Sequence, residues 1–184
     1  MTASSSLNAQ LQTAKAPWVA LLTLKAGQAA DKLIATPEGF IKILLKGTKC
    51  RTDAGLFTEF ARSMKFPDYF GHNWDALEEC LTDLEWLPAK GYILLLTDAD
   101  LVLAEDEEGF QTLVDILRDA GEAWATGQAG SGSRRSVPFH VICALSEHKK
   151  QSRAHWGGIQ ELPGVQTRGS ATRRRSSGRK SPRR

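Results

Sequence analysis

The chain has 184 residues, 41% of them hydrophobic, which suits one domain with its own core. Its formal net charge of +3 averages a basic tail, with eleven Lys and Arg and one acidic residue from position 149 onward, and an acidic remainder with thirteen basic and twenty acidic residues. Three cysteines without paired short spacing exclude a disulfide framework, and no apolar run is long enough to cross a bilayer. Because the N-terminus also lacks the features of a signal peptide, we expect a cytoplasmic protein that does not associate with membranes.

The first part of the chain has no clear periodicity of hydrophobic residues. Residues 1–16 are small and polar, and we expect them to be disordered. The apolar segment 18–24 fits either a short extra strand or a segment packed on the domain. We therefore expect residues 1–35 to form a mostly disordered N-terminal extension and residues 36–146 to form the domain.

Three apolar segments of strand length follow within the domain. They cover residues 40–45, 91–97 and 137–145. The middle one is a continuous apolar run, which is typical of a strand in a sheet covered by helices. Pro138 lies at the beginning of the last segment, where a strand tolerates a missing backbone donor.

Helical patterns separate these strands. One helix is expected to begin at Thr52 or Asp53 and to end before Pro67, and a second to follow a capping residue at Asn73. A third has apolar residues at helical spacing, namely Phe110, Leu113, Val114 and Leu117. The order strand, helix, helix, strand, helix, strand predicts an α/β fold with a small parallel sheet and right-handed crossovers.

The stretch of residues 66–86 carries the most specific signal in the chain. It reads as a loop with an aromatic tip, followed by a short helix in which Asp75, Glu79 and Asp83 recur every four residues, with Glu78 beside them. No Lys or Arg occurs in this stretch, although like charges four residues apart destabilise a helix. One interpretation is a solvated helix face; the other, which we favour, is a surface that meets a positively charged partner.

The sequence of this stretch resembles the signature of the barstar family, intracellular inhibitors of the secreted ribonuclease barnase. The string PDYFGHNWDALEECLT over residues 67–82 carries the resemblance, and the order of elements on both sides fits it. The resemblance implies a three-stranded parallel sheet packed against helices, and the tails before residue 36 and after residue 146 lie outside it. It also implies that the loop and the acidic helix bind the active site of a small basic ribonuclease, one to one and without a cofactor or metal.

The resemblance assigns residues to this interface. Tyr69 matches the tyrosine of the family's binding loop and Asp75 its first helix aspartate, while Glu79 stands at the central aspartate and Asp119 at a glutamate on a later helix. Gly71 and Asn73 match the residues that shape the family's loop. Glu78 stands where the family has an aromatic residue. The predicted partner-binding residues are Tyr69, Gly71, Asn73, Trp74, Asp75, Glu78, Glu79 and Asp119.

These residue types suit the chemistry of an inhibitor. Carboxylates can take the place of RNA phosphate oxygens and accept paired hydrogen bonds from Arg, and Glu79 is our candidate for the central anion. Tyr69 and Trp74 could supply apolar contact area, although Trp74 fits packing inside the domain equally well. Asp119 has a second interpretation as the partner of Arg118 in a surface ion pair.

Other functions have weaker support in the sequence. It contains no HExxH, CxxC, G-x-S-x-G, P-loop or dinucleotide-binding motif, so we expect no catalysis and no cofactor. A related module directed at a different toxin or protein partner stays open. The basic tail, residues 147–184, is expected to be disordered; it could contact nucleic acid non-specifically or fold back on the acidic body.

Overall fold

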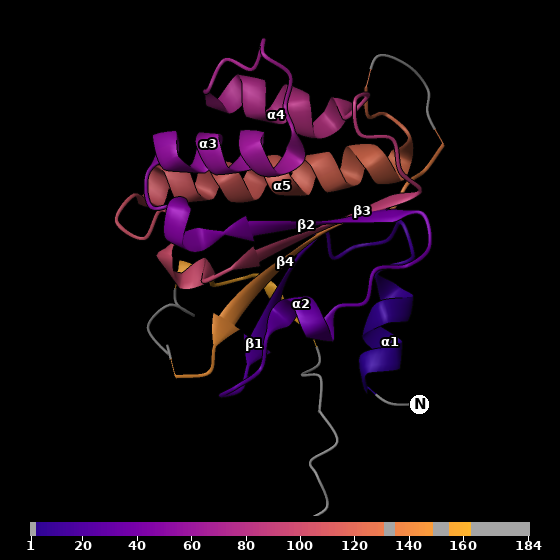
Figure 1. The fold of residues 1–184 in the computed structure, drawn as a ribbon, viewed down its shortest axis with the longest axis vertical. Coiled ribbons are helices and arrows are strands. Elements are labelled where there is room, and N and C mark those ends of the chain that lie inside the picture. The colour runs from indigo at the N-terminus through magenta and orange to yellow at the C-terminus, as the bar shows by residue number, and fades with distance from the viewer. Residues whose placement is uncertain (1–2, 131–134, 149–154, 163–184) are drawn as a thin grey trace, which may run out of the picture.

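A five-stranded sheet forms the centre of the computed structural model, which describes residues 3–130, 135–148 and 155–162 (Figure 1). The strand order is β2-β3-β4-β1-β5, and every neighbouring pair is parallel. In chain order the strands are β1 (Val19–Leu24), β2 (Phe40–Lys46), β3 (Gly91–Thr97), β4 (Phe139–Ser146) and β5 (Gln160–Glu161). The expected α/β fold with a parallel sheet is confirmed, but the sheet has five strands rather than three.

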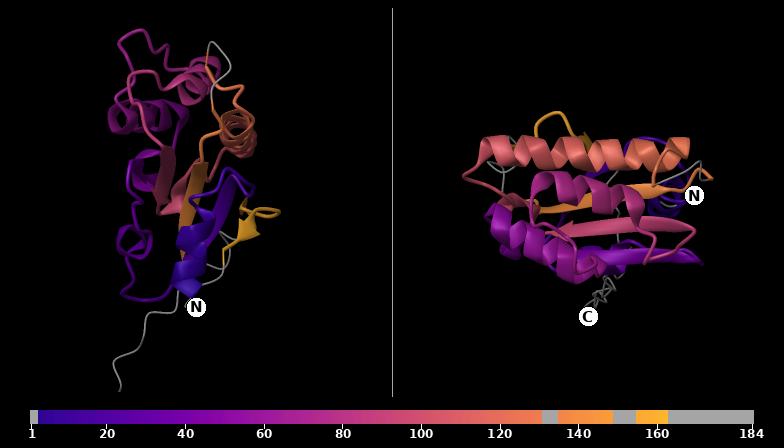
Figure 2. Two further views of the ribbon diagram at one scale, coloured as in Figure 1. Left: turned by 90° about the vertical axis from the view of Figure 1, so that its right-hand side faces the viewer. Right: turned by 90° about the horizontal axis from the view of Figure 1, so that it is seen from above.

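Helices cover both faces of this sheet (Figures 1 and 2). They are α1 (Ala3–Gln10), α2 (Ala30–Leu33), α3 (Asp53–Met64), α4 (Trp74–Asp83) and α5 (Glu107–Thr126), with short 3-10 turns η1 (Gly47–Lys49) and η2 (Ala99–Leu101). Helices α3, α4 and α5 lie on one face, and α1 and α2 lie on the other. Among the described residues, no helix is both long and apolar enough to cross a bilayer.

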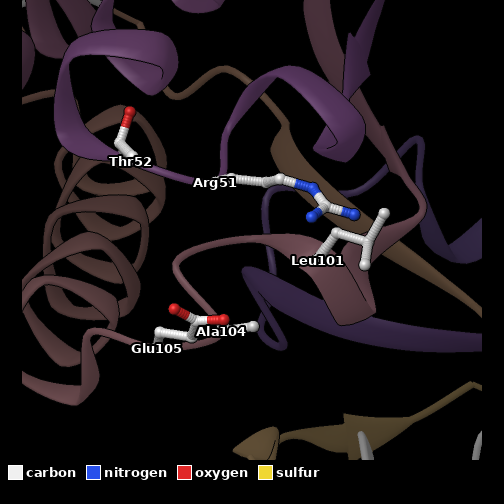
Figure 3. A pocket seen from close by; sticks show the side chains of 5 residues that line it. All are labelled: Arg51, Thr52, Leu101, Ala104 and Glu105. Atoms are coloured by element: carbon white, nitrogen blue, oxygen red, sulfur yellow. The ribbon is translucent and has the colours of Figure 1, made fainter.

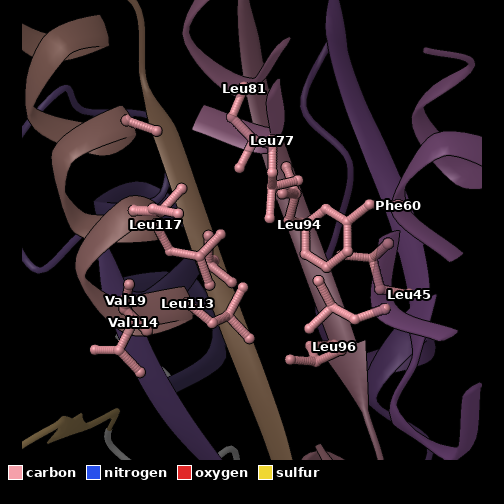
Figure 4. Close-up of a cluster of buried hydrophobic side chains, with 14 of the residues drawn as sticks. Val19, Leu45, Phe60, Leu77, Leu81, Leu94, Leu96, Leu113, Val114 and Leu117 are labelled. Atoms are coloured by element: carbon pink, nitrogen blue, oxygen red, sulfur yellow. The ribbon is translucent and has the colours of Figure 1, made fainter. Parts of the chain in front are cut away.

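The alternation of side chains along β3 explains its apolar sequence. Leu94 and Leu96 enter the larger core, which lies beneath α3, α4 and α5 (Figure 4). Ile93 and Leu95 point to the opposite face and enter a smaller core with residues of α1 and α2. Since successive side chains of a strand alternate between faces and both faces are covered here, every position must be apolar.

Side-chain caps fix the starts of the three helices on the larger core. The hydroxyl oxygen of Thr52 accepts a hydrogen bond from the Gly55 amide, and Asn73 Oδ1 accepts one from the Ala76 amide at 2.8 Å. Asp106 caps α5 in the same way. The predicted helix starts at Thr52 and Asn73 are confirmed, because these side chains satisfy amides that have no partner within the helix.

The N-terminal extension differs from our expectation of disorder. From residue 3 onward it supplies α1, β1 and α2, and β1 pairs with β4 along its whole length. Leu7 and Leu11 are buried in the smaller core. Asn8 Oδ1 of α1 accepts a hydrogen bond from the Ala35 amide at 3.2 Å, so a polar contact accompanies this apolar burial. The segment 18–24 is the extra strand that its composition allowed.

Part of the C-terminal tail is also built into the fold. Trp156 is buried, and its Nε1 donates a hydrogen bond to the Ala99 carbonyl oxygen at 3.1 Å. Strand β5 follows and pairs with β1. The prediction of disorder therefore does not describe residues 155–162, while residues 149–154 and 163–184, which hold the Arg-rich stretch, lie outside the described residues. All three cysteines lie in the described residues, where they are free and buried.

Candidate functional site

An aromatic cluster anchors the loop that precedes α4. Phe66 and Phe70 meet edge to face with ring centroids 4.9 Å apart, and Phe66 also contacts Trp86 at 5.8 Å. Phe70 is only 6% exposed, whereas its neighbour Tyr69 is 70% exposed. Burial of Phe70 thus fixes the loop and leaves the Tyr69 ring projecting into solvent, where a partner can reach it.

A tight turn leads from this loop into the helix. The Phe70 amide donates to the Pro67 carbonyl oxygen at 3.0 Å, and His72 adopts a left-handed conformation with φ 50°. A Cβ added at Gly71 would lie 3.1 Å from Asn73 Nδ2, so a side chain there would press on the residue that caps α4. Gly71 and Asn73 therefore shape the turn, as the resemblance implies, and Asn73 is exposed.

Trp74 joins α4 to α3. Its indole meets the Phe57 ring edge to face, with centroids 5.0 Å apart, and it is only partly buried. Its accessible part lines a cavity of about 300 Å³ together with Thr112 of α5. Of the two roles predicted for Trp74, packing is the one that the structure displays directly.

The acidic residues lie on the outer side of α4. Asp75, Glu78 and Glu79 are exposed, while Leu77 and Leu81 on the opposite side are buried in the larger core. Residues three and four positions apart share a helix face, so the three carboxylates form one acidic patch, which we call the α4 face. Within the part of the chain that the structure describes, no ion pair involves any of these three residues.

Asp119 lies on the neighbouring helix, α5. It is exposed and stands seven residues, about two turns, from Thr112, so it follows the flank of α5 that lines the cavity with Trp74. Arg118 forms an ion pair with Asp115, at 3.5 Å between Nη1 and Oδ1. The alternative reading of Asp119 as the ion-pair partner of Arg118 is therefore not what the structure shows.

The carboxylates of α4 set a negative potential around their neighbours. Burial raises the pKa of the Cys80 thiol to about 11, and the charges of Asp83 and Glu79 add to that rise. The pKa of the Tyr69 phenol is also raised, first by partial loss of hydration and then by the charges of its neighbours, in the order Cys80, Asp83, Glu85 and Glu79. The loop tip and the α4 face thus belong to one electrostatic surface.

Sequence reasoning missed two carboxylates beside this surface. Asp53 and Asp106 line the same cavity as Trp74, and Asp53 Oδ1 is buried without a hydrogen-bond partner among the described residues. Burial, followed by the charge of Asp106, raises the pKa of Asp53. Each residue lies at a helix start, where an acid needs no other explanation, and nothing in the sequence indicates that the two starts meet.

A separate cavity of about 250 Å³ lies near the ends of β2 and β3 (Figure 3). Arg51, Leu101 and Glu105 are among its lining residues, and none of the predicted site residues reaches it. In the described ranges, no group of three or more His, Cys, Asp or Glu side chains is placed to hold a metal ion.

A family model described as Barstar (barnase inhibitor) matches residues 40–144. The match covers more than half of the chain. The chain belongs to the barstar family. Its family region runs from β2 into β4 and includes the aromatic loop, the α4 face and Asp119. Strands β1 and β5 and helices α1 and α2 lie outside the barstar match.

Comparison with solved structures adds information on the fold alone. The barstar-family chain is similar to the Aeropyrum pernix ORC2 protein in its ADP form, with a TM-score of 0.57, 12% identity, and coverage of 89% of this chain and 46% of that one. The same protein in ADPNP–ADP complexes gives a TM-score of 0.51, 16% identity, and coverage of 88% and 45%. This chain thus spans about half the length of those chains. No curated protein shows a significant match.

Proposed function

We propose that this protein inhibits a small basic ribonuclease by covering its active site with the Tyr69 loop and the α4 face. The observation that carries the proposal is the placement of Asp75, Glu78 and Glu79, exposed together without an ion pair among the described residues. Maintaining like charges on one helix face costs stability, so a partner that neutralises them accounts for their presence. Membership of the barstar family supports the same interpretation.

The geometry suits the mimicry of bound RNA. A ribonuclease active site holds phosphate with cationic side chains in a concave cleft, and a protruding helix with carboxylates can enter such a cleft. We assign the role of central anion to Glu79, which is exposed and would accept paired hydrogen bonds from an arginine, with Asp75 one turn away on α4 and Asp119 on the neighbouring helix α5. The exposed ring of Tyr69 would supply apolar area at the edge of the contact.

The acidic field also affects how fast the partners meet. Complementary charge speeds diffusional encounter at low salt, and salt screens this effect over a Debye length of about 10 Å at 0.1 M. In this role the protein acts in the cytoplasm, requires no cofactor and catalyses no reaction. Its effect on RNA cleavage comes from occupying the enzyme.

A second candidate function is favoured by one feature of the α4 face. Glu78 is exposed at the position where the family resemblance places an aromatic residue. A carboxylate there replaces apolar contact area with charge, which suits a partner other than barnase itself. The same surface would then serve a different toxin or protein with a cationic patch.

Calorimetric titration into barnase and other small basic microbial ribonucleases, at low and moderate salt, tests the proposal. We expect one-to-one binding that weakens as salt rises and a parallel loss of RNA cleavage. Absence of binding to every ribonuclease at both salt concentrations would refute inhibition of this class of enzyme. Binding without loss of cleavage would show that the active site is not the part covered.

A further inference from the structure

A groove beside Asp119 is built partly from segments outside the family match. Its volume is about 370 Å³, and it lies between α5, the segment Ala16–Val19 and the segment Gly158–Gln160. Helix α5 contributes Arg118, Asp119 and Glu122 to the lining of the groove. One wall therefore comes from the family domain, and the other from the N-terminal and C-terminal segments of this particular chain.

Close packing holds the wall of this groove in place. A Cβ at Gly121 would collide with Trp18, so α5 and the start of β1 approach as closely as a glycine permits. The ring nitrogens of His140 lie 3.1 Å from the Pro17 carbonyl oxygen and 2.8 Å from that of Thr13. Pairing of β5 with β1 fixes the other rim, with Gln160 opposite Ala20. The groove is thus a preformed feature of the surface.

The lining of the groove suits a cationic side chain. Trp18 offers an aromatic surface, and Asp119 and Glu122 offer two exposed carboxylates. An indole and a carboxylate together recognise a guanidinium group, through a cation–π contact and charge-assisted hydrogen bonds. Arg118 also lines the groove and forms an exposed ion pair with Asp115, so the two carboxylates exceed the one cation among the lining residues of α5.

The groove is continuous with the surface assigned to ribonuclease binding. Asp119 lines the groove and also follows the flank of α5 that faces the Trp74 cavity. A protein seated on the α4 face and in contact with Asp119 would therefore reach the groove. Its contacts there would be with Trp18, Glu122 and Gln160, positions that lie on or beside the segments added to the family domain.

We propose that an arginine-bearing loop of the bound ribonuclease enters this groove, so that the added segments select the cognate enzyme. The inference rests on the proposed inhibitor function and names the part of the same interface that sets specificity. Contacts on the α4 face are directed at an active site that many ribonucleases share. The groove contacts a ribonuclease residue outside that active site, at a position where related enzymes can differ in sequence.

Variants of exposed groove residues test this inference against the ribonuclease that the unmodified protein binds most tightly in the panel above. Glu122→Gln removes one carboxylate, and we expect affinity to fall about fivefold. Gln160→Arg places a cation at the rim, and we expect a fall of about tenfold or more, with a smaller effect on ribonucleases bound weakly. Glu38→Gln, an exposed acid outside the groove, serves as the matched control and should change affinity less than about twofold.

Arginine-to-alanine substitutions in the ribonuclease complete the experiment. One of them should show a coupling of about fivefold or more with Glu122→Gln in a double-mutant cycle. If both groove variants bind within twofold of the unmodified protein while Glu79→Ala binds weakly, the groove inference is refuted and the inhibitor function stands. If the unmodified protein binds no ribonuclease, the inhibitor function is refuted, and the groove inference falls with it. Circular dichroism confirms that each variant is folded.

Discussion

Trp124 of α5 donates its indole N–H to the carbonyl oxygen of Leu81 in the last turn of α4, at 2.9 Å. The carbonyl groups at the end of a helix have no partner within the helix, and both residues are buried, so this bond satisfies a group that water does not reach. It also joins the two helices that carry Glu79 and Asp119. The spacing of the proposed binding carboxylates therefore depends on a contact in the interior.

Trp124→Phe removes that bond while keeping an aromatic ring. We expect the free energy of unfolding to fall by about 1–3 kcal/mol, because a buried carbonyl oxygen loses its donor. Urea denaturation followed by circular dichroism measures the change. Thr126→Ala, at an exposed site on the same helix, should change stability by less than about 0.5 kcal/mol. Equal stability of the two variants would show that the indole bond contributes nothing.

Glu79→Ala tests the centre of the α4 face. We expect at least about 2 kcal/mol of binding free energy to be lost against a ribonuclease that the unmodified protein inhibits, since central anchors dominate interface energies. Asp83→Ala, further along the helix, should matter less. Calorimetry measures both, and a loss below about 0.5 kcal/mol for Glu79→Ala would mean that the interface centre lies elsewhere.

Tyr69 and Phe70 are neighbours with opposite expected roles. Tyr69→Ala removes a ring that is 70% exposed, so we expect little change in stability but weaker ribonuclease binding, by about 1 kcal/mol or more. Phe70→Ala removes a buried ring and should lower the free energy of unfolding by about 3 kcal/mol or more. Measuring stability and affinity on both variants separates the roles. A large loss of stability for Tyr69→Ala would contradict the loop geometry.

Asp53 should make stability depend on pH. Its pKa in the folded protein is raised, first by burial and then by Asp106, so the folded state disfavours the ionised form. The contribution of the Asp53 carboxyl group to stability is fully present at pH values below its pKa in the unfolded chain. That contribution is lost as the pH rises through its higher pKa in the folded protein. Asp53→Asn should therefore be more stable than the unmodified protein at neutral pH, by less than about 1 kcal/mol because the side chain is partly solvated.

Thermal unfolding across pH checks the Asp53 prediction. The advantage of Asp53→Asn should disappear in acid, where the carboxyl of the unmodified protein is protonated in both states. Glu38→Gln, at an exposed site, provides the comparison for removal of one acid from the surface. A constant advantage at all pH values would point to helix capping rather than to ionisation.

Local signals in the sequence were sufficient for the elements that lie close together along the chain. The caps at Thr52 and Asn73 were predictable because each side chain bonds an amide three residues away. The apolar run of β3 indicated a strand in a sheet covered by helices, and the structure shows that both of its faces are covered. Asp53 and Asp106 were not predictable as neighbours, since their approach depends on how α3 and α5 pack on the sheet.

The residues of the sequence alone were enough to identify the family and to predict the aromatic loop and the acidic helix, because the residues that shape that region are contiguous and act on one another locally. Only the tertiary structure decided that β1 lies between β4 and β5, that Trp156 is part of the core, and that Asp119 borders a groove. Those placements depend on contacts between segments more than one hundred residues apart in places, such as Ala20 with Gln160. These placements result from the burial of apolar surfaces against one another. Which surfaces meet is set by distant segments, so the local sequence around one segment carries no pattern that identifies its neighbour.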